Sequence, residues 1–147
     1  MRSLKALTVL LLGVSVSGQT PIDFTGHWRQ RTNSGIQRQL EVEQKGKSLR
    51  VKTVITNSEG TRNLEVQYEI GGSETTYKGL DGDEFRSSVH WNGSNLVFDT
   101  IEHEAGTEVP QKAVWTLSAD GNTLQVDRQV TKSGRTTNTS ATFARQP

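Results

Sequence analysis

The 147-residue sequence contains no cysteine. This absence excludes disulfide scaffolds, Cys-ligated metal sites, cysteine nucleophiles and a lipid attached to an N-terminal cysteine. Apolar residues are also few, at 31% of the chain, and aromatic residues make up 6%. Such a composition is thin for a core of several layers. A β-sheet closed on itself can form with it, because each strand then supplies one inward apolar row and one outward polar row.

The sequence has no large excess of charge of either sign. It contains 17 Lys and Arg against 16 Asp and Glu; two of the bases, Arg2 and Lys5, lie in residues 1–18, which leaves 15 bases and a net charge of −1 after residue 18. A nucleic-acid-binding protein would need a basic patch or stripe against phosphate. The composition therefore gives no reason to expect nucleic acid as a partner.

Long apolar runs are confined to the N-terminus. Residues 1–18 begin with basic residues, continue with the apolar stretch Ala6–Val16 and end in small residues. This order is typical of a secretory signal peptide, so we expect residues 19–147 to be a single secreted or periplasmic domain. The alternative is a membrane anchor, but eleven residues are well short of the roughly 20 that a spanning helix needs. No membrane span is expected.

Helical periodicity is absent from the chain after the leader. Residues 64–70 and 123–127 instead alternate between apolar and polar side chains, as half-buried strands do. We predict an all-β fold, an antiparallel up-and-down meander β-barrel of eight to ten strands with no significant helix after the signal peptide. Glycines at near-regular intervals mark the expected turns, at Gly35, Gly46, Gly60, Gly71, Gly72, Gly82, Gly93, Gly106, Gly121 and Gly134.

Three of these turns also predict which side chains face each other. Two-residue turns at Lys45-Gly46, Asn92-Gly93 and Asp120-Gly121 place the apolar rows of their flanking strands on one face, and a slip of one residue would turn such a row to water. The predicted inward pairs are Val42 with Leu49, Leu40 with Val51, Arg38 with Thr53, Val89 with Leu96, Ser87 with Phe98, Phe85 with Thr100, Leu117 with Leu124, Trp115 with Val126 and Ala113 with Arg128. The predicted outward charge pairs are Glu41 with Arg50 and Arg86 with Asp99.

The segment Asp23-Phe24-Thr25-Gly26-His27-Trp28 directly follows the leader. It resembles the Phe-x-Gly-x-Trp start of the first strand in lipocalins and fatty-acid-binding proteins, together called calycins. The resemblance implies that Phe24, Gly26 and Trp28 are structural residues, and that Trp28 closes one end of the barrel. It also implies a cation–π pair between Trp28 and Arg145 of the last strand.

Other features of the sequence can be compared with the two branches of that superfamily. Ten strands resemble the fatty-acid-binding branch more than the eight-stranded lipocalins. However, Gln30–Gly35 is too short for the helical lid of that branch, Arg128-Gln129-Val130 lacks the Tyr of its Arg-x-Tyr carboxylate site, and no C-terminal helix follows as in lipocalins. The sequence is most similar to small secreted lipocalin-like proteins of bacteria, whose ligands are mostly unassigned.

Two arginines, Arg38 and Arg128, fall on the predicted inward rows opposite the small residues Thr53 and Ala113. They could hold the carboxylate, sulfate or phosphate group of an amphipathic ligand. The alternative is that they are solvated at an open barrel mouth, or paired with an inward acid such as Glu102.

The apolar part of such a ligand would lie on aromatic side chains. The predicted ligand-binding residues are Arg38, Thr53, Tyr68, Ser87, Trp91, Phe98, Trp115 and Arg128. The alternative is that Phe85, Trp91, Phe98 and Trp115 are core, because a narrow barrel would be filled by these rings.

No catalytic site is predicted. The sequence has no nucleophile elbow, no Gly-rich phosphate loop between a strand and a helix, and no isolated carboxylate pair in apolar surroundings. The three histidines, His27, His90 and His103, lack metal-ligand spacing, and a site at His103 with neighbouring carboxylates is the weaker alternative to solvated surface residues. We therefore expect no metal and no cofactor.

Three functions compete at this stage. The first is a secreted, non-enzymatic barrel that binds a small hydrophobic or amphipathic molecule in its lumen. The second is a protein-interaction or inhibitor module with a filled core, whose protein partner meets the loops at one rim. The third is a barrel enzyme that uses His27, His90 or His103 with a neighbouring acid.

Overall fold

The computed structural model describes residues 22–147, so the predicted signal peptide lies outside the described residues. Within residues 22–147 every regular element is a strand, and no helix long and apolar enough to cross a membrane is found there. The ten strands follow one another along the chain as β1 (Gly26–Gln30), β2 (Gln37–Lys45), β3 (Ser48–Asn57), β4 (Gly60–Glu69), β5 (Thr75–Lys78), β6 (Glu84–Asn92), β7 (Asn95–Glu104), β8 (Thr107–Leu117), β9 (Thr123–Lys132) and β10 (Arg135–Gln146).

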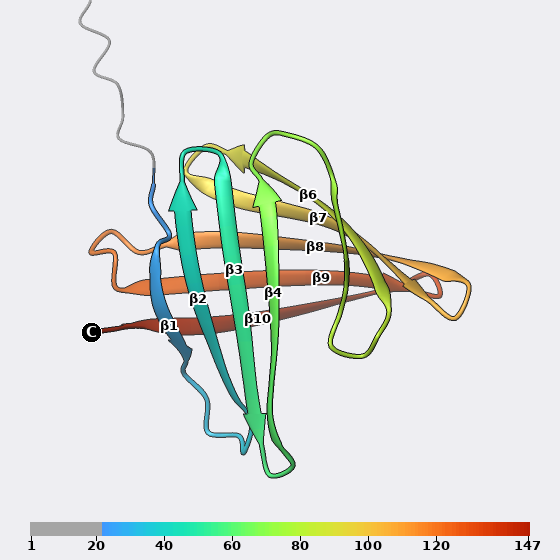
Figure 1. The fold of residues 1–147 in the computed structure, drawn as a ribbon, viewed down its shortest axis with the longest axis horizontal. Coiled ribbons are helices and arrows are strands. Elements are labelled where there is room, and N and C mark those ends of the chain that lie inside the picture. The colour runs from blue at the N-terminus through green and yellow to red at the C-terminus, as the bar shows by residue number, and fades with distance from the viewer. Residues whose placement is uncertain (1–21) are drawn as a thin grey trace, which may run out of the picture.

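The strands form one antiparallel sheet that curls into a nearly closed barrel. The hydrogen-bonded order is β4-β3-β2-β1-β10-β9-β8-β7-β6-β5, which is a meander closed through β1 and β10. Figure 1 shows β2, β3 and β4 crossing β8 and β9. The predicted fold class is confirmed, at the upper end of the predicted strand number.

The barrel is continuous between its first and last strands. The first and last strands are hydrogen-bonded, with Trp28 opposite Arg145. The break lies between β4 and β5, where the described contacts include Thr75 Oγ1 donating to the Gln67 carbonyl over 3.1 Å. After β4 the chain makes an isolated parallel bridge from Ile70 to Val89, and the Ile70 amide also donates to the Lys47 carbonyl over 2.7 Å. Consecutive strands pair along the rest of the sheet.

The predicted registers are right at one turn and shifted by two residues at the other two. Around Asp120-Gly121 the pairs Leu117–Leu124, Trp115–Val126 and Ala113–Arg128 are confirmed. At the other two turns the loop residues are Gly46-Lys47 and Gly93-Ser94, one position later than predicted. The observed pairs are Val42–Val51, Leu40–Thr53, Arg38–Ile55, Val89–Phe98, Ser87–Thr100, Phe85–Glu102, Glu41–Lys52, Glu43–Arg50 and Ser88–Asp99.

The shift has a local cause in turn geometry. Gly46 and Gly93 have φ values of 58° and 61°, and the residues after them are not among those with positive φ. A positive φ at only the first central residue belongs to type II′ turns, which place glycine first, whereas the prediction placed it second as in type I′. Because side chains alternate with a period of two, a shift of two residues changes every partner and leaves every face unchanged.

One end of the barrel is closed by a packed core. The residues next to the β2–β3, β6–β7 and β8–β9 turns, Leu49, Leu96 and Leu124, are all 0% exposed. Two aromatic residues from the start of the chain, Phe24 and Trp28, are 0% and 1% exposed and complete this end. We call it the closed end.

Trp28 is held at the closed end from both sides. Its indole Nε1 donates to the Phe24 carbonyl over 3.0 Å, and the Arg145 guanidinium lies 4.3 Å from the indole ring centroid. The stacked pair implied by the calycin resemblance is therefore present. Gly26 lies against the same guanidinium: its φ is +154°, and a Cβ there would collide with Nη1 of Arg145. Glycine at this position is what lets the arginine reach the ring.

The opposite end is open. Figure 1 shows the β3–β4 turn pointing away from the β7–β8 and β9–β10 turns, so the barrel flares at this end. The connection between β1 and β2 contains no helix that could cover it, as the shortness of Gln30–Gly35 indicated. β10 is exposed over residues 135–140, because β1 pairs only with residues 143–146. We call this end the mouth.

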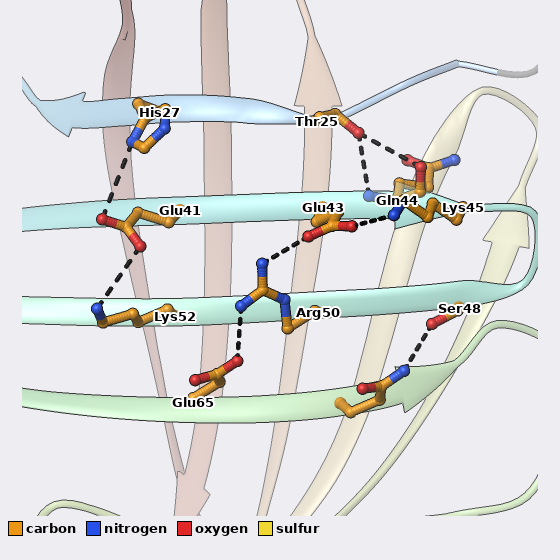
Figure 2. A network of polar contacts seen from close by, with 11 residues as sticks. Thr25, His27, Glu41, Glu43, Gln44, Lys45, Ser48, Arg50, Lys52 and Glu65 are labelled. Carbon is orange, nitrogen blue, oxygen red and sulfur yellow. Dashed lines mark hydrogen bonds and ion pairs between the residues drawn. The ribbon is translucent and has the colours of Figure 1, made fainter.

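The outer face of β1–β4 carries the polar rows that the strand alternation predicted. Arg50 donates to Glu65 Oε1 over 2.8 Å and also pairs with Glu43, whose other oxygen lies 2.6 Å from Lys45 Nζ (Figure 2). These partners raise the pKa of Arg50 and lower that of Glu43. The groups are exposed, so solvent screens the pairs and they add little to stability.

Candidate functional site

A cavity of about 690 Å³ occupies the barrel between the closed-end core and the mouth. Each strand except β1, β5 and β6 contributes at least two lining residues, because the inward row of a strand continues from the core into the cavity wall. Six of the eight residues predicted to bind a ligand line this cavity: Arg38, Thr53, Tyr68, Phe98, Trp115 and Arg128.

Aromatic rings from β4 to β8 form one side of the cavity. Phe98 lies at the centre, with its ring centroid 4.8 Å from that of Trp115 and 5.4 Å from that of Tyr68. Tyr77 and Phe85 add a parallel stack, with centroids 5.5 Å apart and planes at 6°. We call these five residues the aromatic wall. Of the four rings for which a core role was the alternative, Phe85, Phe98 and Trp115 line the cavity, and Phe98 and Trp115 also belong to the buried core.

Arginines from β2, β4 and β9 form the charged part of the cavity: Arg38, Arg62 and Arg128. None of them takes part in an ion pair among the described residues. Burial, and next the charge of Arg128, lower the pKa of Arg38. Arg38 is half-buried, whereas Arg62 and Arg128 are exposed toward the open end. The cavity therefore presents guanidinium groups whose charge no protein carboxylate offsets through an ion pair.

The wall between the arginines and the rings includes Tyr68. Burial raises the pKa of this phenol well above its ordinary value, with a further contribution from Tyr77, and the positive charge of Arg128 opposes the shift. Tyr68 therefore stays protonated at physiological pH and can donate a hydrogen bond to an anion beside Arg128.

Two predicted ligand-binding residues do not line the cavity. Ser87 is 1% exposed, and its hydroxyl is hydrogen-bonded to Thr100 Oγ1 at 2.7 Å and to the Tyr77 hydroxyl at 3.1 Å. Its hydroxyl is thus engaged within the protein, and the contact helps to orient Tyr77. Trp91 lies at the closed end, where its ring centroid is 6.1 Å from that of Phe24. Trp91 is half-buried and packs against the core, in agreement with the alternative interpretation.

The sequence reasoning missed Arg62 and Tyr77. Arg62 could have been found, since it continues the alternating row of Leu64, Val66 and Tyr68 toward the mouth. Tyr77 lies in β5, a strand of 4 residues whose composition shows no clear alternation. Nothing in the sequence around Tyr77 distinguishes an inward from an outward position.

Three carboxylates meet at the mouth beside β5 and β6. Oxygen atoms of Asp81, Asp83 and Glu102 lie within 4.8 Å of one another. Glu102 does not pair with an arginine, as the alternative interpretation had proposed. It accepts a hydrogen bond of 2.6 Å from Gln111 Nε2. His103 is not part of this group.

The carboxylate group predicts a pH-dependent stability. Burial, followed by a hydrogen bond with Asp83 and the neighbouring acids, raises the pKa of Glu102. Between the ordinary carboxyl pKa of about 4.3 and this raised value, the folded state holds a proton that the unfolded state has lost. Stability therefore falls as pH rises through this window, and the full penalty is present above it.

Replacing Glu102 with Gln is accordingly expected to stabilise the protein at pH 8. Urea unfolding at pH 8 and pH 4 measures the effect: the midpoint of Glu102→Gln lies above that of the unmodified chain at pH 8, and the difference shrinks at pH 4. The exposed Glu108→Gln serves as the matched control and leaves both midpoints nearly unchanged. A Glu102→Gln variant that is less stable at pH 8 would contradict the assignment.

The histidines face outward and form no joint site. His27 Nδ1 lies 3.9 Å from Glu41, and His90 Nδ1 lies 3.5 Å from Asp99, both on the outer surface. His103 is opposite Glu84 and Glu108 on the outer row. An enzymatic site built on these histidines therefore lacks access to the cavity.

No protein-family model matches the sequence, and no curated protein matches it. Solved structures do match. A REP1-NXSQ fatty acid transporter superimposes with a TM-score of 0.65 and 12% identity, over 84% of this chain and 96% of that one. The extracellular fatty acid binding protein As-p18 gives a TM-score of 0.63 and 11% identity, over 86% and 98% of the two chains.

A third similar structure is secretory abundant heat soluble protein 4 from Ramazzottius varieornatus, with a TM-score of 0.63 and 13% identity over 84% of this chain and 95% of that one. The chain has a calycin fold. The resemblance seen in Asp23–Trp28 is thus confirmed for the fold. In this calycin barrel the first-strand motif closes one end, and the inward rows beyond it form the cavity.

Proposed function

We propose that the protein is a secreted, non-enzymatic carrier that binds one small amphipathic anion in the cavity. The proposal rests on one observation: the same cavity is lined by the aromatic wall and by arginines that form no ion pair with a protein carboxylate. An anion on Arg38 and Arg128 would offset their charge, and the apolar part of the ligand would cover Phe98 and Trp115. The cavity of about 690 Å³ falls in the range of roughly 300–1,000 Å³ typical of small-molecule sites.

Similar structures support a binding role. Those with the same fold include proteins described as a fatty acid transporter, an extracellular fatty acid binding protein and a bile-acid-binding protein complexed with cholic acid. All three are described as proteins that bind or transport a fatty acid or a bile acid, which are amphipathic molecules with an acidic group. The alternative, a protein-interaction module, requires a filled lumen, and the cavity favours the carrier over it.

Titration with chemically matched amphiphiles tests the proposal. Dodecanoate and dodecyltrimethylammonium have equal chains and opposite charges, and isothermal titration calorimetry below their micellar concentrations compares them. We expect dodecanoate to bind at one site with a micromolar Kd and the cation not to bind. Equal binding of both, or no binding of the anion, would overturn the proposed function.

A further inference from the structure

We propose that the cavity selects amphiphiles whose head group carries two negative charges, such as an alkyl phosphate monoester, and holds that head at the mouth with the alkyl chain toward the aromatic wall. The inference rests on the proposed function and adds the charge of the head group and the direction in which the ligand enters.

The direction follows from the order of side chains along two strands. On β9 the inward residues run from Leu124, 0% exposed, through Val126, 8% exposed, to the exposed Arg128. On β2 they run from the buried Leu40 to the half-buried Arg38. On each strand the arginine is therefore the next inward-facing residue toward the mouth after the last buried aliphatic residue, which is Val126 on β9 and Leu40 on β2. A head-group-first orientation would put the charge against the closed-end core, where no basic side chain lines the wall.

The charge follows from the groups that line the cavity. Arg38, Arg62 and Arg128 supply three positive charges, and Asp81 is the one acidic residue among the lining residues described. Lys112 also lines the cavity, but it lies 3.7 Å from Asp99 outside. A carboxylate brings one charge and two oxygens, so it leaves an arginine uncompensated. A phosphate monoester brings two charges and three terminal oxygens, and guanidinium groups bind such oxygens in bidentate fashion.

Solvent exposure at the mouth makes a dianion acceptable there. Transfer of an ion from water into a dry interior is strongly unfavourable, and more so for two charges than for one. Arg62 and Arg128 are exposed, so a head group between them keeps part of its hydration. The lowered pKa of Arg38, caused by burial and by the charge of Arg128, means that an anion shared by these two arginines relieves an existing repulsion.

Dodecyl phosphate and dodecyl methyl phosphate test the charge. At pH 8 the first carries two negative charges and the second one, while the chain and the phosphorus centre are the same. Isothermal titration calorimetry is expected to give a Kd at least about tenfold lower for dodecyl phosphate. Arg38→Gln and Arg128→Gln should each remove most of this preference, Arg62→Gln should reduce it, and the outward, exposed Arg29→Gln should preserve it.

Each outcome of this titration is decisive. Equal affinities for the two phosphates would overturn the inference and leave the proposed function standing, whereas no binding of either phosphate or of dodecanoate would overturn both. A preference that survives Arg38→Gln and Arg128→Gln would show that other groups produce it and would overturn the assignment.

Bromine-labelled chains test the direction. Bromine quenches indole fluorescence at short range, and Trp115 lines the cavity whereas Trp28 and Trp91 belong to the closed end. We expect 12-bromododecyl phosphate to quench the fluorescence more strongly than 2-bromododecyl phosphate. The reverse order would place the head group toward the closed end and overturn the orientation.

Discussion

Trp28→Ala is expected to lower the free energy of unfolding by about 3–5 kcal/mol, the range for removing a buried tryptophan from a close-packed core. The side chain is 1% exposed and packs at the closed end beside Phe24. Its removal also leaves the Arg145 guanidinium without the ring that it covers at 4.3 Å. Because a domain of this size is stable by only about 5–15 kcal/mol, the variant should unfold at a much lower urea concentration.

Trp28→Phe separates packing from the polar contact. It keeps an aromatic ring under Arg145 and loses the hydrogen bond from Nε1 to the Phe24 carbonyl, so a smaller loss is expected. Equilibrium urea unfolding, monitored by far-UV circular dichroism, measures the free energy of unfolding of both variants. A loss below about 1 kcal/mol for Trp28→Ala would show that the first-strand motif does not hold the barrel closed.

The faces of the strands could be predicted from the sequence because alternation has a period of two. Leu40, Val51, Val126 and Trp115 were placed inward, and all four are buried. The exact partners were less predictable. Gly46 and Gly93 can occupy either central position of a two-residue turn, and the choice between type I′ and type II′ shifts the register by two residues.

The cavity could be predicted only where regular strands supply its residues. Arg38 and Arg128 continue clear inward rows, so their place on the wall follows from alternation. The carboxylates of Asp81 and Asp83 come from the connection between β5 and β6, where no periodicity indicates direction. Their approach to Glu102 depends on the path of that connection, which only the folded chain defines.

The prediction with the largest expected effect on binding is Ala113→Trp. Ala113 lines the cavity between Phe98 and Arg128, its partners on β7 and β9. An indole at this position would fill the space in front of the aromatic wall that the alkyl chain needs. We expect the affinity for dodecanoate and for dodecyl phosphate to fall at least about tenfold, or by at least 1.4 kcal/mol.

Gln129→Trp is the matched control for this substitution. Gln129 adjoins Arg128 on β9 but is exposed on the outer face, opposite Lys112, so the same indole placed there should leave binding unchanged. Ala113→Trp enters an open cavity and needs no overpacking of the core, and its urea midpoint should therefore stay close to that of the unmodified chain. If Ala113→Trp folds and binds both amphiphiles with unchanged affinity, the ligand does not occupy the barrel, and the site must be sought on the outer surface.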